Sequence, residues 1–171
     1  PLAMCIQFAK LIAHKLAAEL DQAITFFIVT KNKGYFKELN KINVFKTGCH
    51  IYFNNSRVDK HTSIRLRTFC VQRIHEVFGS LHYTNSESDV VDQRIPFRQN
   101  GLMYIGDFKT GYCGGRYSIR YCASLIAGVF TEDYLSEARF LAEYRNYLPL
   151  IYAFVFEKPE WEPLDTKKTK P

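Results

Sequence analysis

Three polar side chains in this sequence are of the types that handle phosphate groups and divalent metal ions. His50 lies within an apolar, strand-like run, Asp92 follows two valines, and Lys109 ends a second strand-like run. Histidine and lysine can contact phosphate oxygens, and a carboxylate is the oxygen ligand that magnesium and manganese prefer. Convergence of the three would therefore suit the chemistry of a nucleotide.

The run around His50 is typical of a β-strand. Alternation along it places His50 and Tyr52 on one face. The opposite face then carries Cys49, Ile51 and Phe53. The glycine before Cys49 permits close approach of a ligand or of another backbone. His50 is therefore either a donor to a phosphate oxygen or a half-buried structural histidine, and the segment alone favours the structural role.

Asp92 lies in Val90–Ile95, which we interpret as a strand at the edge or end of a sheet because a proline follows it. A buried carboxylate in such a strand must be paired, hydrogen-bonded or bound to a metal. An exposed one would instead pair with Arg94 or Arg98. Asp89 is the weaker candidate, since it stands in the preceding turn.

Lys109 shares a face with Asp107 in the predicted strand 102–109. A lysine beside an acid can neutralise a triphosphate or the scissile phosphate of a nucleic acid. The simpler alternative is a surface salt bridge, worth less than about 1 kcal/mol. The basic residues that could extend a basic surface around it are Lys46, Arg94, Arg98, Arg116 and Arg120.

Composition restricts the class of protein. The chain has 171 residues, 47% of them hydrophobic, so it can bury the core of one domain. Its net charge of +6 favours polyanions such as nucleic acid, although solubility alone would also explain it. The five cysteines form no Cys-x-x-Cys pair, which indicates free thiols in a reducing compartment. Without a membrane-length apolar run or a secretory signal, we expect an intracellular protein with no membrane partner.

Apolar periodicity indicates the elements that must position these side chains. We expect Thr62 or Ser63 to cap one helix and Gly79 to end it, and Thr131 to cap the last helix. The element order predicts an α+β domain around a mainly antiparallel sheet. Helices are predicted at 5–20, 62–78 and 132–146, a loop with a short helix at 31–40, and strands at 24–29, 48–54, 90–95, 102–109, 116–123 and 148–156.

The two ends of the chain differ from its centre. Residues 1–4 look like the remnant of a cleaved tag, so we expect an excised part of a longer polypeptide. The α+β domain is assigned to residues 5–157, and whether 131–157 belong to it or lead to a next domain stays open. Residues 158–171 combine prolines with lysines, which is the composition of a linker or tail.

The order of these motifs resembles the archaeo-eukaryotic primase superfamily, in particular the primase domain of poxvirus- and asfarvirus-type primase-helicases. Such primases carry a small–x–His motif on a strand, which Gly48–Phe53 matches, followed by a helix, here 62–78. A strand-borne acid, here Asp92, precedes an apolar strand with a basic end, here 102–109. The resemblance covers about residues 5–130 and implies an RRM-like primase palm, an antiparallel sheet flanked by helices.

This resemblance also implies roles for individual residues. Asp92 and His50 would be catalytic: Asp92 would hold Mg²⁺ or Mn²⁺, and His50 would contact the phosphates of the incoming NTP or dNTP. Phosphate contacts would also come from Lys109, Lys46 and Arg98. The implied partners are a single-stranded DNA template and a helicase domain in the same full-length chain. The implied location is the cytoplasmic or nuclear site of viral DNA replication.

One motif of the superfamily is not matched. An Asp-x-Asp or Asp-x-Glu pair on a strand normally precedes the first helix, and no such pair stands before the helix 5–20. Either the sequence was cut just after that motif or the protein is divergent. In both cases we expect this fragment alone to lack full polymerase activity.

A second resemblance is to the PD-(D/E)xK nucleases, especially the RecB-like group with its Asp-Tyr-Lys-Thr-Gly run, which 107–111 resembles. Asp92 and Asp107 would then hold the metal, and Lys109 would stabilise the pentavalent phosphate. Tyr144 or Tyr152 could stand in for that group's downstream tyrosine. The histidine motif would be incidental, so its presence would have no explanation.

A third hypothesis involves no catalysis. The chain would keep a primase-like fold and serve as a basic interaction module of a replication complex. The unmatched acidic motif favours this interpretation. Substitutions separate the three hypotheses: the primase needs His50 and tolerates Asp107→Asn, the nuclease needs Asp107 and tolerates His50→Ala, and the module tolerates both.

Overall fold

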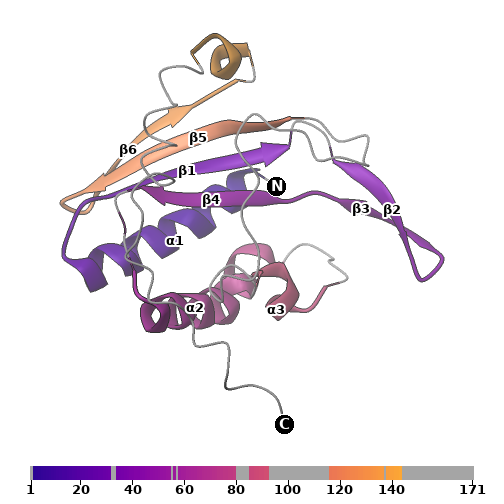
Figure 1. The fold of residues 1–171 in the computed structure, drawn as a ribbon, viewed down its shortest axis with the longest axis horizontal. Coiled ribbons are helices and arrows are strands. Elements are labelled where there is room, and N and C mark those ends of the chain that lie inside the picture. Colours follow the sequence, from indigo (N-terminus) through magenta and orange to yellow (C-terminus); the bar gives the residue numbers. More distant parts are fainter. Residues whose placement is uncertain are drawn as a thin grey trace, which may run out of the picture.

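The computed structural model describes residues 2–31, 34–54, 56, 58–79, 85–92, 116–136 and 138–143. Three helices and six strands follow one another in this part of the chain, and residues 138–143 are helical as well (Figure 1). In chain order the elements are α1 (Leu2–Leu20), β1 (Ile24–Lys31), β2 (Tyr35–Leu39), β3 (Ile42–Lys46), β4 (Cys49–Asn54), α2 (Lys60–Phe78), α3 (Glu87–Val90), β5 (Tyr117–Ile126) and β6 (Val129–Tyr134).

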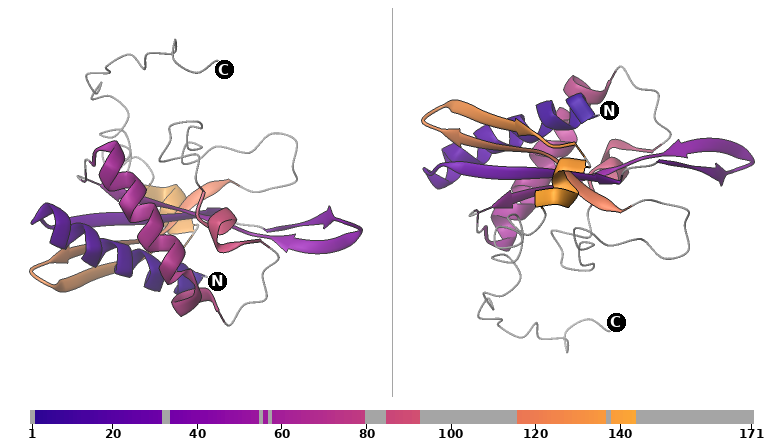
Figure 2. Two further views of the ribbon diagram at one scale, coloured as in Figure 1. Left: turned by 90° about the horizontal axis from the view of Figure 1, so that it is seen from below. Right: turned by 90° about the horizontal axis from the view of Figure 1, so that it is seen from above.

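Four strands form an antiparallel sheet in the order β4-β1-β5-β6. The apolar β1 lies inside it, with Val29 opposite His50 of β4 on one side and opposite Ile119 of β5 on the other. The strands β2 and β3 pair only with each other and extend beyond the end of this sheet (Figures 1 and 2). The α+β class and the antiparallel sheet are confirmed.

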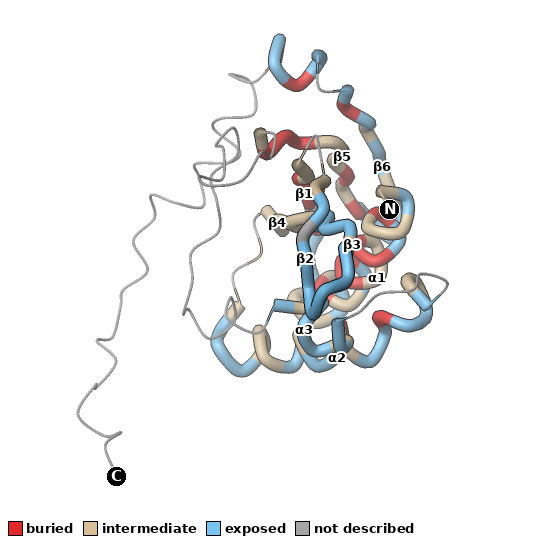
Figure 3. Tube along the Cα trace, turned by 90° about the vertical axis from the view of Figure 1, so that its right-hand side faces the viewer, coloured by how far each residue is buried: buried red, intermediate tan, exposed pale blue. Residues whose placement is uncertain are grey.

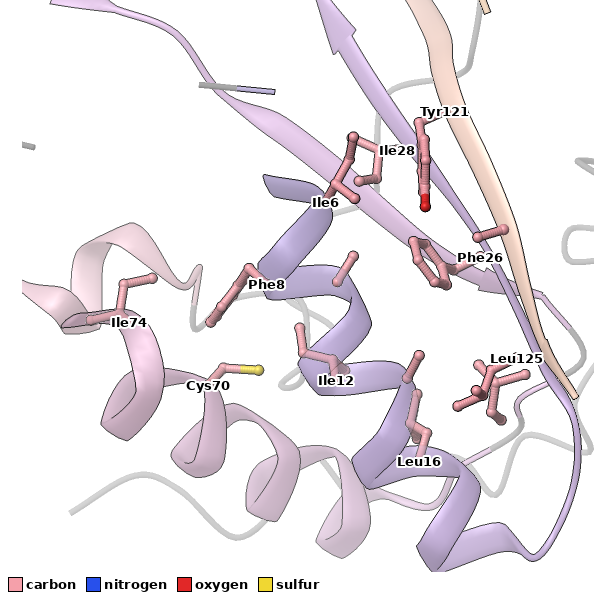
Figure 4. Packing of buried hydrophobic residues seen from close by; sticks show 14 residues of the cluster. Ile6, Phe8, Ile12, Leu16, Phe26, Ile28, Cys70, Ile74, Tyr121 and Leu125 are labelled. Atoms are coloured by element: carbon pink, nitrogen blue, oxygen red, sulfur yellow. The ribbon is translucent and has the colours of Figure 1, made fainter. Parts of the chain in front are cut away.

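One face of the sheet carries the larger core. α1 repeats apolar side chains at helical spacing, so Ile6, Ile12 and Leu16 face the sheet, where they meet Phe26 and Ile28 of β1 (Figure 4). α2 packs against α1 through its own buried face (Figures 2 and 4). Burial of these side chains is the main force that holds the two helices on the sheet.

The opposite face carries a smaller apolar cluster. Phe27 and Val29 of β1 pack there with Ile119 of β5, and the chain after β6 covers them with Leu135 and Phe140. The register between β1 and β5 shifts at Ile28/Val29, because Ile28 pairs with Tyr121 and Val29 with Ile119. Arg120 is therefore the extra residue of a β-bulge.

Several predicted elements are confirmed. The structure contains the helices 5–20 and 62–78 and the strands 24–29, 48–54 and 116–123, with α1 beginning already at Leu2. α2 ends at Gly79 as predicted, but its N-cap is Asp59, whose carboxylate accepts a hydrogen bond of 2.6 Å from the Thr62 backbone N–H. The prediction that Thr62 or Ser63 would cap this helix was wrong, because an aspartate three residues earlier satisfies the same donor.

The prediction of a loop with a short helix at 31–40 was wrong. This segment contains β2, which pairs with β3 through a two-residue turn at Asn40 and Lys41. Both turn residues have positive φ, 51° and 64°, as a type I′ hairpin requires. The usual Asn-Gly signal is missing, so the hairpin is not visible in the sequence.

The prediction of a helix at 132–146 capped by Thr131 was right for 138–143 but wrong for its start and its cap. Thr131 lies within β6, opposite Ser124 of β5, and the strand continues to Tyr134. The helical segment within the described residues is 138–143, where the Ser136 hydroxyl accepts from the Arg139 backbone N–H. The predicted strands 102–109 and 148–156 lie outside the described residues.

Replacing Ala127 with asparagine should stabilise the fold. Ala127 and Gly128 form the turn between β5 and β6 with φ of 48° and 82°. Asparagine tolerates a positive φ better than alanine, so we expect the free energy of unfolding to rise by about 0.5–1 kcal/mol in urea titrations. Ala138→Asn, in the exposed helical segment, should lower it through helix propensity. A change in the free energy of unfolding that has the same sign in both variants would contradict the turn geometry.

Candidate functional site

His50 faces away from α1 and α2. It lies on β4, whose Cys49, Ile51 and Phe53 contact the larger core, whereas Tyr52 packs with the cluster on the opposite face. The predicted alternation of this strand is thereby confirmed. The side chain of His50 is half-buried, and its ring stacks on Tyr117 of β5.

A row of rings and one cation continues from His50 along this face. The ring centroids of His50 and Tyr117 are 5.0 Å apart at 18°, and Tyr52 meets His50 edge-on at 6.2 Å. The Lys31 Nζ lies 5.4 Å from the Tyr117 ring and 5.1 Å from the Tyr35 ring. We call these five residues the His50 row. Aromatic faces next to an ammonium group suit a ligand that has both a planar base and phosphates.

Two tyrosines of the His50 row, Tyr52 and Tyr117, have raised pKa values. Burial, followed by the neighbouring Tyr117, raises the pKa of Tyr52 to about 12. The pKa of Tyr117 is also raised, first by burial and then by Tyr35. Both hydroxyls therefore stay protonated near neutral pH and can donate hydrogen bonds. The positive charge of Lys31 is then not offset by a tyrosinate.

Lys46 comes close to the His50 row through strand pairing. It is exposed at the end of β3, and its Cα partner in β2 is Tyr35. Arg116 immediately precedes β5, and Arg120 occupies the bulge. Within the part of the chain that the structure describes, the Arg120 Nε is buried without a hydrogen-bond partner. Three residues of the predicted basic surface, Lys46, Arg116 and Arg120, therefore lie on or next to strands that carry the His50 row.

Asp92 does not lie on a strand. Val90 ends the short helix α3, and Asp92 follows it as an exposed residue. Ser86 caps α3, because its hydroxyl accepts from the Asp89 backbone N–H, and this cap outweighs the β-propensity of the two valines. The predicted strand 90–95 is therefore wrong for its first residues. Asp89, predicted in a turn, belongs to this helix.

The position of α3 places Asp92 away from His50, with which it was predicted to form one site. α3 packs against α2, on the helix side of the sheet (Figure 1), whereas the His50 row lies on the other face. Predicted site residues outside the described part of the chain are Arg98, Asp107 and Lys109, together with Arg94, Tyr144 and Tyr152.

A metal site would need further ligands. Among the residues that the structure describes, no three His, Cys, Asp or Glu side chains gather in a metal-binding arrangement. Asp92 has the chemistry of a magnesium or manganese ligand, and magnesium is commonly held by one or two carboxylates plus substrate phosphates. The described residues would thus supply one such ligand. No helix in this part of the chain is long and apolar enough to cross a membrane.

The sequence interpretation missed most of the His50 row. Tyr117, Lys31 and Tyr35 were not singled out. Lys31 and Tyr35 belong to a segment in which lysines and aromatic residues are interleaved, a pattern typical of nucleic-acid-binding surfaces. Their proximity to His50 depends on the strand order β4-β1-β5 and on the hairpin that follows β1. The interleaving of aromatic and basic residues around 31–46 was the available signal.

Thiol reactivity should differ between the cysteines behind His50. The Cys49 thiol lowers the pKa of Cys5 by hydrogen bonding, and the same bond, followed by burial, raises the pKa of Cys49. Burial raises the pKa of Cys70 to about 12. We therefore expect iodoacetamide at pH 8 to alkylate Cys5 before Cys49 and Cys70, as followed by peptide mass spectrometry. Faster labelling of Cys70 would contradict this packing.

Comparison with known proteins supplies the family. The family model described as the C962R protein N-terminal AEP domain matches residues 4–122, where AEP denotes archaeo-eukaryotic primase. This range is more than half of the chain and includes His50, Lys31, Tyr35 and Tyr117. No curated protein and no solved structure matches the chain. The predicted resemblance is confirmed, and the chain belongs to the family of the N-terminal archaeo-eukaryotic primase domain of C962R, a viral primase-helicase.

Proposed function

We propose that this chain binds a nucleoside triphosphate on the face of its sheet opposite α1 and α2, for template-directed nucleotidyl transfer in viral DNA replication. The observation that carries the proposal is the His50 row, in which the Tyr117 ring stacks with His50 and also lies 5.4 Å from the Lys31 Nζ. The substrate expected for a chain of the primase family is a nucleoside triphosphate. Its aromatic base and its phosphates match the rings and the cation of this row.

Each residue has a chemical part in this proposal. His50 donates a hydrogen bond to a phosphate oxygen, and its stacking on Tyr117 fixes the plane of the ring. Lys31 and Lys46 offset phosphate charge, and Arg98 and Lys109 add to this through the family resemblance. Such charge compensation favours the transition state of phosphoryl chemistry.

Asp92 has the carboxylate that the resemblance implies as a metal ligand. When bound, Mg²⁺ or Mn²⁺ would polarise the phosphate and favour attack by the primer 3′-oxygen. Asp92 is exposed after α3, which packs against α2 on the other side of the sheet from the His50 row, so this role requires the triphosphate to reach past the edge strand β4. We further propose that the domain acts beside a helicase domain of the same full-length chain, because C962R is a primase-helicase.

Titration of a labelled nucleoside triphosphate with Mg²⁺ or Mn²⁺ tests the proposal. Loss of a charge-assisted hydrogen bond costs about 1.5–3 kcal/mol, so His50→Ala should weaken binding at least about tenfold. Asp92→Asn should weaken the metal dependence. The control is His61→Ala, an exposed histidine on α2, which should bind as the wild type does. Wild-type affinity in His50→Ala would overturn the proposal.

The same variants separate the alternatives. Metal-dependent DNA cleavage that is lost with Asp107→Asn would favour the nuclease over the primase. Unchanged DNA and nucleotide binding in both His50→Ala and Asp107→Asn would favour a non-catalytic interaction module. For the primase, Asp107→Asn should bind nucleotide as the wild type does.

A further inference from the structure

The hairpin formed by β2 and β3, which we call the hairpin arm, exposes apolar side chains that a folded chain normally buries. Phe36 is 72% exposed and Phe45 58%, and Leu39 and Ile42 are exposed as well. The tube in Figure 3 shows this hairpin as mostly exposed, in contrast to the buried centres of β1 and β5. An isolated two-stranded hairpin is marginal in water, so this surface suits a binding partner.

The two phenylalanines form a unit that is suited to stacking. Phe36 lies directly opposite Phe45 in the register of the hairpin arm, so both rings are on one face. Their centroids are 5.3 Å apart with 66° between the planes, an edge-to-face pair. A planar base can stack on the ring face that is open to solvent, and such stacking tolerates any base sequence.

Charge identifies the partner. The segment 31–46 contains five lysines against a single acid, Glu38. A purely apolar protein surface would not require so many positive charges, whereas a nucleic-acid backbone does. Aromatic side chains interleaved with lysines are the combination with which proteins bind single strands. A duplex is a poorer fit, because its bases are already stacked on one another.

The hairpin arm is continuous with the His50 row. β1 ends at Lys31, four residues before the hairpin arm begins at Tyr35, and β3 leads back into β4 just before His50 (Figures 1 and 2). Tyr35, at the base of the hairpin arm, lies 5.1 Å from the Lys31 Nζ, which in turn lies 5.4 Å from the Tyr117 ring. A strand held on the hairpin arm would therefore lead towards the proposed nucleotide site.

We propose that the hairpin arm binds the single-stranded DNA template, with bases stacked on Phe36 and Phe45 and phosphates held by its lysines. The direction of the DNA strand in this inference rests on the proposed function, whereas the binding of the strand does not. Stacking accounts for a large share of single-strand affinity. The double variant Phe36→Ala/Phe45→Ala should thus bind a single strand at least about tenfold more weakly.

Fluorescence anisotropy of a labelled strand of about 16 thymidines measures this on the whole chain. The matched control is Ile126→Ala/Val129→Ala, two exposed apolar residues beside the β5–β6 turn, which should bind as the wild type does. Lys41→Gln at the tip of the hairpin arm should reduce the slope of log affinity against log salt by about 0.7. Equal affinities of both double variants and the wild type would overturn the proposal.

Two further readouts keep the conclusions separate. The Phe36→Ala/Phe45→Ala variant should bind nucleoside triphosphate as the wild type does, so loss of triphosphate binding in His50→Ala alone would contradict neither proposal. Triphosphate binding that requires His50, with single-strand binding indifferent to the phenylalanines, would overturn only the hairpin proposal. Sedimentation velocity tests whether the hairpin arm instead binds a second copy of this chain. If the wild type is a dimer and Phe36→Ala/Phe45→Ala is a monomer with unchanged DNA affinity, the hairpin proposal is overturned as well.

Discussion

Replacing Phe26 with alanine is expected to lower the free energy of unfolding by about 3–5 kcal/mol. The side chain is 0% exposed on the inner strand β1. Its ring centroid lies 5.7 Å from that of Phe53, 5.9 Å from that of Tyr121 and 6.3 Å from that of Phe130. Truncation would open a cavity between three strands that cannot close around it without moving the sheet. Chemical denaturation followed by circular dichroism measures the loss.

The control for Phe26→Ala is Phe36→Ala, the same substitution at a side chain that is 72% exposed. Surface truncations of this kind change stability by at most about 0.5 kcal/mol. The difference between the two variants therefore reports burial rather than residue type. Similar losses in both would mean that the hairpin arm is packed against something or that β1 is not central.

Glu132→Ala should have the second largest effect, a loss of about 1–3 kcal/mol. The hydroxyl of the buried Tyr121 donates to the Glu132 Oε2 at 2.7 Å, and the Lys10 ammonium contacts the other oxygen. Removal of the carboxylate leaves that hydroxyl without its acceptor and frees Lys10 of α1 from β6. Glu76→Ala, which breaks the exposed pair with Arg73, should cost less than about 1 kcal/mol.

We expect the free energy of unfolding to fall in acid because of the Glu132 carboxylate. Lys10, and then Tyr121, hold the pKa of Glu132 below its usual range. A carboxyl whose pKa is lower in the folded state stabilises the fold fully at pH values above its unfolded-state pKa of about 4.3. This stabilisation is lost as the pH falls through the folded-state pKa. Urea titrations between pH 6 and pH 3 should show a smaller acid loss in Glu132→Gln. Parallel curves for the wild type and this variant would contradict the network.

Elements with a buried face were predictable from the sequence. Periodicity identified α1 and α2, and short β-branched or aromatic runs identified β1, β4 and β5. The hairpin arm and β6 were missed for the opposite reason: their exposed side chains, such as Phe36 and Val129, leave no burial pattern. Their turns use Asn40-Lys41 and Ala127-Gly128, where no Asn-Gly or Asp-Gly pair marks the change of direction.

The candidate site was predictable only in part. The order of motifs was enough for the family, and alternation placed His50 on the correct face of its strand. The ring partner of His50, Tyr117, comes from a strand that is remote in sequence, so no local pattern could pair them. Asp92 was misplaced because the serine cap of α3 is a local hydrogen bond that competes with the preferences of valine.

The strand order β4-β1-β5 has a consequence for synthesis on the ribosome. Ile28 of β1 meets Ile51 of β4 soon after both emerge, but its other neighbour, Tyr121 of β5, is translated much later. At about 5–20 residues per second, the delay between Ile51 and Tyr121 is roughly 4–14 s. During this interval α1 can cover the face of β1 but not its second edge, which is open to pairing with another nascent chain. Translation speed across the segment before β5 should therefore govern how much of the protein escapes aggregation.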